Sequence, residues 1–128
     1  MGRCVADGCV APPDTVYSGC GGGITGGGSG LVVASSGWIS RWRRTRAGGP
    51  RTIVGTWADS AGAAHLFRAI RATRFRSVPP GKPSNWTCFF RLVDSAGAYE
   101  VPYSSGLPPA LREVDSLIQV LDRYAREP

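Results

Sequence analysis

The sequence predicts an α+β fold, in which an antiparallel sheet of about four to five strands carries two helices on one face. Two segments repeat apolar residues at helical spacing, and several short β-branched and aromatic runs lie between Gly- and Pro-rich turns. These elements follow the order ββ(β)αββα, which implies an antiparallel sheet. A length of 128 residues suits one domain and leaves no room for a second core.

The N-terminal region has little periodicity. We expect residues 1–16, which include Pro12 and Pro13, to form an irregular arm, and residues 17–128 to form the single α+β domain. The glycine-rich run 19–30 cannot form a regular helix, because each glycine adds a backbone entropy cost. Within it, residues 21–26 match G-x-G-x-x-G, but a strand follows where a dinucleotide site needs a helix. A bent or bulged strand close to another backbone is the favoured interpretation.

Three strands are expected before the first helix. Residues 31–34 and 38–44 form a plausible hairpin around the turn at residues 35–37, and residues 51–57 follow the break at residues 47–50. Asp59 then provides an N-cap for a helix over residues 60–73. Its buried face is predicted from the i, i+3, i+4, i+7 spacing of Ala63, Leu66, Phe67 and Ile70.

The second half of the chain repeats this alternation. Residues 86–93 give the strongest strand signal and pair with residues 98–103 through the turn at residues 94–97. Pro102 indicates that this strand ends there or lies at a sheet edge. The last helix begins at Pro108 or Pro109, since proline suits a first helical turn. Its apolar stripe consists of Ala110, Leu111, Val114, Leu117, Ile118 and Leu121.

The four cysteines, Cys4, Cys9, Cys20 and Cys88, permit three disulfide pairings. Disulfides favour an oxidising compartment. A Cys20–Cys88 bond would tie the glycine-rich segment to the central strand, although the sequence does not fix connectivity and free buried thiols are the alternative. We therefore expect an extracytoplasmic protein, periplasmic or secreted, whose leader is missing from this sequence; a cytoplasmic protein is the alternative. No stretch reaches the ~20 apolar residues of a transmembrane helix.

Catalytic and metal chemistry find little support in the sequence. His65 is the sole histidine, no C-x-x-C pair is present, and no serine elbow or reactive-cysteine signature accompanies them. Asp94 and Glu100 could approach each other, but turns commonly carry such acids. We expect no enzyme activity, no catalytic or metal-binding residues and no cofactor.

The strongest candidate for a binding site is a segment rich in Arg and Trp. The formal net charge of +6 comes almost entirely from arginine, which is also the pattern of a solvated surface. Trp and Arg are favoured anchors of protein interfaces, and they also suit single-stranded nucleic acid. The alternative places the tryptophans in the core and leaves the arginines in water. The candidate partner-binding residues are Trp38, Arg41, Trp42, Arg43, Arg44, Arg46 and Arg51.

From residue 17 onward the pattern resembles the emfourin family, small protein inhibitors of thermolysin-type metalloproteases. The similarity begins with Tyr17-Ser18-Gly19 before the glycine-rich strand and covers about residues 17–125. It continues through the apolar residues that close the first helix (Ile70, Phe75, Val78, Pro79) and through the segments 88–94, 97–101 and 107–111. The resemblance implies a cofactor-free binding protein and assigns no inhibitory residue.

These observations favour a non-catalytic protein-binding domain, with inhibition of a secreted metalloprotease as its most concrete form. One alternative is an accessory or structural subunit of a larger extracytoplasmic assembly. The second is a nucleic-acid-binding protein that uses the Arg/Trp-rich hairpin. A nucleic-acid complex would lose affinity steeply with added salt, because its phosphate contacts release counterions.

Overall fold

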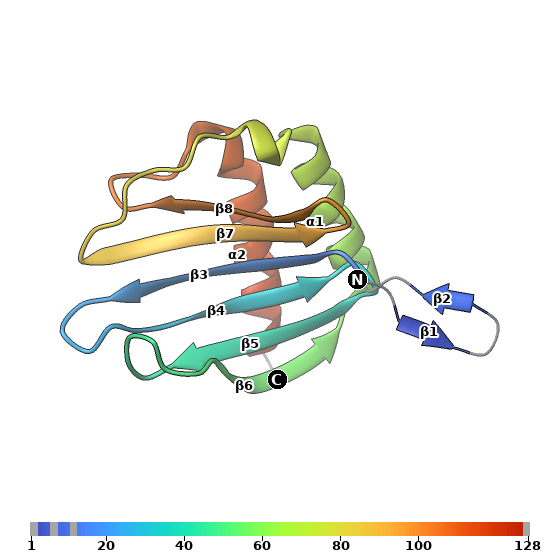
Figure 1. Cartoon of the computed structure of the whole chain (residues 1–128), viewed down its shortest axis with the longest axis horizontal. Coiled ribbons are helices and arrows are strands. Elements are labelled where there is room, and N and C mark those ends of the chain that lie inside the picture. Colours follow the sequence, from blue (N-terminus) through green and yellow to red (C-terminus); the bar gives the residue numbers. More distant parts are fainter. Residues whose placement is uncertain (1–2, 6–7, 11–12, 127–128) are drawn as a thin grey trace.

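The computed structural model describes the backbone of residues 3–5, 8–10 and 13–126, and the side chains of residues 13–123. A six-stranded antiparallel sheet has the strand order β6-β5-β4-β3-β7-β8 (Figure 1). Its strands are β3 (Thr15–Gly22), β4 (Gly27–Ala34), β5 (Trp38–Arg44), β6 (Thr52–Ala58), β7 (Trp86–Asp94) and β8 (Gly97–Tyr103). A separate two-stranded sheet pairs β1 (Arg3–Val5) with β2 (Gly8–Val10).

The α+β class is confirmed, but the predicted number and order of strands are wrong. The main sheet has six strands, in the order ββββαββα, instead of four to five in the order ββ(β)αββα. The missed strand is β3, which begins at Thr15 inside the predicted irregular arm and runs into the glycine run. The predicted strand 31–34 is the end of the longer β4. The arm is also not irregular throughout, because β1 and β2 lie in it.

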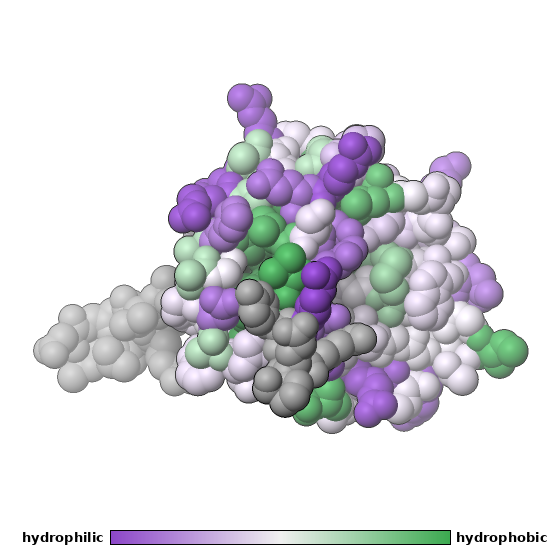
Figure 2. Space-filling view, turned by 180° about the vertical axis from the view of Figure 1, so that it is seen from behind, coloured by the Kyte–Doolittle hydropathy of each residue, from purple (hydrophilic) through white to green (hydrophobic). Residues whose placement is uncertain are grey.

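Both long helices lie behind the sheet in Figure 1 and cover one of its faces. They are α1 (Ser60–Ala72) and α2 (Arg112–Arg126), and each adjoins a short 3₁₀ turn, η1 (Phe75–Ser77) or η2 (Pro109–Leu111). The N-cap prediction is confirmed: the Asp59 carboxylate accepts a hydrogen bond from the Gly62 amide at 2.8 Å. Seen from the helix side, hydrophilic residues surround a smaller apolar area (Figure 2).

The core lies between this helical layer and the sheet. The predicted apolar stripe of α1 is buried, and in α2 Val114, Ile118 and Leu121 are buried while Leu117 is partly so. They meet side chains from the alternate positions of the strands, because successive strand residues face opposite sides. The sheet contributes Val16, Leu31, Val33, Ile39, Phe90, Leu92 and Val101.

A disulfide joins the neighbouring strands β3 and β7. Cys20 and Cys88 lie directly opposite each other in the ladder and are bonded, with their Cα atoms 3.9 Å apart. The predicted Cys20–Cys88 pairing is therefore confirmed. The backbones of Cys4 and Cys9 are opposite each other in the β1–β2 ladder, but their side chains lie outside the described residues.

We expect loss of this bond to destabilise the domain substantially. Its cysteines are 68 residues apart, and a disulfide that closes so long a loop typically contributes about 2–4 kcal/mol to the free energy of unfolding. Replacing both Cys20 and Cys88 with alanine, in a background in which Cys4 and Cys9 are also alanine, should produce this loss in guanidinium unfolding. Dithiothreitol should cause a similar loss in the background protein. Equal stability of the two proteins would contradict the expectation.

Candidate functional site

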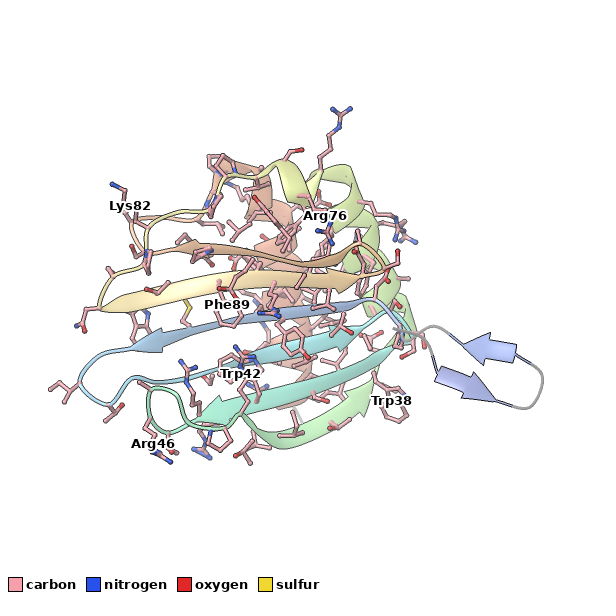
Figure 3. The ribbon with its side chains drawn as sticks, in the orientation of Figure 1. Trp38, Trp42, Arg46, Arg76, Lys82 and Phe89 are labelled. Carbon is pink, nitrogen blue, oxygen red and sulfur yellow. A yellow bond between two sulfur atoms is a disulfide. The ribbon has the colours of Figure 1, made fainter. Side chains whose placement is uncertain are left out.

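The sheet face without helices, called here the open face, carries a cluster of aromatic side chains. Trp42 from β5 and Phe89 from β7 lie near its centre, with ring centroids 6.1 Å apart (Figure 3). Tyr17 from β3 belongs to the same face, because it pairs with residues on both neighbouring strands that also face this side. Three strands thus bring aromatic rings together across the middle of the sheet.

Trp42 is buried although no helix covers it. Its side chain is 1% exposed, and its indole N–H donates a hydrogen bond to the Ser18 carbonyl at 3.1 Å. The ring lies over the backbone of Gly19, where a Cβ would overlap both the ring and the Ser29 carbonyl oxygen. A glycine at position 19 therefore allows the bulky ring to lie close against the strand.

Arg51 covers the cluster from the solvent side. Its guanidinium carbon lies 4.9 Å from the Trp42 ring centroid, 5.5 Å from that of Phe89 and 5.6 Å from that of Tyr17. A guanidinium over an aromatic face is attracted by the ring quadrupole while its in-plane N–H donors stay free. Among the described residues, no hydrogen bond or ion pair engages Arg51.

The other predicted site residues are dispersed. Trp38 lies on the same face as Trp42, four residues away at the end of β5, and is 58% exposed (Figure 3). Arg43 and Arg46 are exposed, Arg46 in the turn before β6. Arg44 lies on the open face, and its Nε is buried without a hydrogen-bond partner.

Arg41 faces the helices instead. It forms an ion pair with Asp122 of α2 at 2.5 Å and lies 5.9 Å from the ring centroid of Trp57. The same guanidinium donates a hydrogen bond to the backbone carbonyl of Asp122. Arg41 therefore ties β5 to α2 and is not part of the surface that the open face presents.

A pocket of about 290 Å³ adjoins the aromatic cluster on the open face. Trp42 and Phe89 contribute apolar walls, Arg44 and Arg51 contribute cations, and Glu100 contributes a carboxylate. Phe89 and Glu100 were not predicted as site residues. Strand alternation would have placed them on one face of a hairpin, but nothing in the sequence marks which face lacks helices.

The outer edge of β6 is a second exposed feature. Residues 52–56 are all exposed, and the strand Thr52–Ala58 contains no charged residue. β6 ends the sheet order, and in the described part of the chain no strand pairs with its outer side. Ile53 and Val54 are 53% and 46% exposed, which is high for large apolar residues. Such an edge is a ready template for another strand.

The opposite edge, β8, is covered by the segment that leads from α1 to β7 (Figure 1). The Gly81 amide donates to the Pro102 carbonyl at 2.7 Å, and Arg76 donates to the Gly97 carbonyl at 2.7 Å. The Tyr99 hydroxyl donates to the Val78 carbonyl at 2.6 Å. Pro102 itself has no N–H to offer. The two sheet edges therefore differ. Hydrogen bonds from the segment before β7 cover the β8 edge, whereas no strand of the described chain pairs with the outer side of β6.

A second cavity, also of about 290 Å³, lies between the sheet and α2 and includes Tyr103 and Asp115 in its lining. Burial, and secondarily the negative charge of Asp115, raise the pKa of Tyr103 to about 12. Both effects favour the neutral phenol, which stacks on Phe90 with ring centroids 6.0 Å apart. The surroundings of Tyr103 therefore favour the protonated hydroxyl.

No family model matches the chain, and no curated protein shows significant similarity to it. Among the described residues, no group of three or more His, Cys, Asp or Glu side chains is placed to hold a metal ion. No helix in the same part of the chain is both long and apolar enough to cross a membrane. The described residues offer three surface features: an exposed strand edge, an aromatic cluster and a cationic pocket.

The glycine under Trp42 can be tested by substitution. Gly19→Ala should lower the free energy of unfolding by about 1–3 kcal/mol, because the added methyl displaces a packed ring. It should also shift the indole N–H resonance of Trp42 as the bond to Ser18 lengthens. Gly55→Ala is the matched control, since a Cβ there has no neighbour within 4 Å. Equal effects of the two substitutions in urea unfolding would argue against the packing account.

Tyr103 predicts a loss of stability at alkaline pH. Its pKa is about 12 in the folded protein and about 10 when unfolded, so the folded state holds the proton more tightly. The contribution is complete below pH 10 and declines as pH rises towards 12. Because the residue is only about half buried, we expect about 1 kcal/mol between pH 9 and pH 12. Urea unfolding of the wild type should show this extra decline relative to Tyr103→Phe, and parallel curves would contradict it.

Proposed function

We propose that this chain is a non-catalytic protein-binding domain that takes up an extended segment of its partner along the outer edge of β6. The bare edge is the observation that carries the proposal. An unpaired strand offers a row of backbone N–H and C=O groups that only another extended segment can pair with completely. The exposed Ile53 and Val54 side chains add apolar contact area on the same strand.

The charge around this edge indicates the chemistry of the partner. Arg43 and Arg46 are exposed near the beginning of β6, Arg51 directly precedes it, and the chain carries a net charge of +6. β6 itself is uncharged. We therefore expect the partner segment to be apolar along its length and acidic at the end that lies beside these arginines. Complementary charges of this kind set orientation and increase the association rate.

Three further parts of the proposal concern the compartment, the identity of the partner and nucleic-acid binding. The Cys20–Cys88 disulfide supports an oxidising, extracytoplasmic compartment. The emfourin resemblance supports a thermolysin-type metalloprotease as the partner, and an assembly subunit is the alternative. Nucleic-acid binding is disfavoured because Trp42 lies beneath Arg51 and is not free to stack on a base.

The β6 proposal can be tested with a substitution that blocks strand addition. Val54 is passed over at the irregularity in the β5–β6 register, so proline there removes no residue pair of that ladder. Val54→Pro should weaken partner binding at least about tenfold, since an edge proline cannot donate to an added strand. Val54→Thr is the matched control, because it keeps the shape and the N–H. The first measurement is titration of a purified thermolysin-type protease with each protein.

The outcomes separate the versions of the proposal. Stoichiometric inhibition that Val54→Pro relieves and Val54→Thr retains supports the metalloprotease version. If no such protease is inhibited, that version is wrong, and a photoreactive side chain at residue 54 should identify the partner, with residue 98 on β8 as the control position. The purified partner must then protect the β6 amides from hydrogen exchange. Dimerisation in ultracentrifugation that only Val54→Pro abolishes would replace the hetero-partner with a second copy.

A further inference from the structure

The open-face pocket has a composition that none of the observations on β6 explains. Arg44 and Arg51 both line the pocket. Among the described residues, neither side chain forms an ion pair or a hydrogen bond. The Nε of Arg44 is buried without a partner, which costs free energy unless an acceptor reaches it. No carboxylate of the described residues therefore forms an ion pair with either guanidinium group.

The position of Arg51 is fixed by the rings beneath it. Its guanidinium carbon lies within 6 Å of three ring centroids, so the group is held over Trp42, Phe89 and Tyr17. Among the described residues no acceptor engages the N–H donors of this side chain, so they remain available to a ligand. Little side-chain entropy then remains to be lost when an anion binds, which is the benefit of preorganisation.

The walls and the charges of the pocket define its ligand. The volume of about 290 Å³ is at the lower limit for small-molecule sites, and Trp42 and Phe89 make part of the wall apolar. Two guanidinium forks suit a planar oxyanion that can be bound by paired N–H donors. Glu100 also lines the pocket, so Arg44, Arg51 and Glu100 together carry one net positive charge, which a ligand with a single negative charge balances.

We propose that this pocket binds a carboxylate group carried on a small apolar body, with the carboxylate held by Arg44 and Arg51 and the apolar body against Phe89. The proposal shares Arg51 with the charge argument for β6, but it requires no partner along that strand. The same chemistry has two sources, a free small carboxylic acid or the acidic side chain of a bound polypeptide. A dianionic phosphate fits less well, because its second charge exceeds the one net positive charge of Arg44, Arg51 and Glu100.

The test is a titration of the full chain with defined probes, followed by the NMR shifts of the arginine Nε–Hε groups. Benzoate represents a free acid, N-acetyl-glutamate N-methylamide represents an acidic side chain, and inorganic phosphate is the competing anion. We expect saturable shifts of Arg44 and Arg51 with a carboxylate probe, and weaker binding of phosphate at pH 7.5. The tighter of the two carboxylates identifies the source.

Variants separate a built pocket from general attraction to a basic protein. Arg44→Gln should weaken the better carboxylate about tenfold, because it removes a charge-assisted pair of hydrogen bonds. Arg44→Lys should also weaken it, since an ammonium keeps the charge but lacks the fork. Arg46→Gln removes the same charge from an exposed turn outside the pocket lining and should change affinity less than twofold.

Three results would overturn the proposal. They are an absence of saturable shifts, phosphate binding tighter than both carboxylates, or equal losses from Arg44→Gln and Arg46→Gln. Thermal unfolding of each variant shows whether it is folded, and Arg44→Lys serves if Arg44→Gln is not. None of these results depends on the Val54→Pro experiment, so the pocket and the β6 edge can fail separately.

Discussion

Trp42 lies on the side of the sheet that has no helices, and the open face is organised around keeping it from water. The ring packs on the backbone at Gly19, where a side chain would overlap it. Its indole N–H donates a hydrogen bond to the Ser18 carbonyl. Arg51, from the segment before β6, covers the ring. An antiparallel sheet can expose one face, but a large ring on that face must be buried by local means.

The same arrangement links the two features that carry function. Arg51 stacks on the aromatic cluster and directly precedes β6, so the strand edge and the pocket share a covalent neighbour. Binding at the β6 edge or in the pocket therefore affects the segment around Arg51, which belongs to both sites. The covered β8 edge takes no part in this, because Arg76 and the segment around Gly81 already occupy it.

Sequence reasoning succeeded where the signals are local. Asp59 and the apolar spacing after it were enough to place α1, and the β-branched and aromatic residues around Phe90 were enough to place β7. β3 was missed because three of its eight residues are glycine, which leaves little alternation to read, and its pairing with β7 depends on residues far along the chain. The burial of Trp42 on a sheet face without helices could not be inferred either. It depends on Arg51 and Gly19, which approach the ring only after the sheet has formed.

The bond between Cys20 and Cys88 lies at the place where the two parts of the sheet meet. The strands β3 to β6 come from one stretch of the chain, and β7 and β8 come from another, with α1 between them. Every peptide bond from residue 20 to residue 88 therefore lies inside a covalently closed ring. A single cut in an exposed turn of this ring, such as the one around Arg46, leaves both fragments attached. The nicked molecule keeps its sheet pairing within one covalent unit and separates into pieces only after reduction.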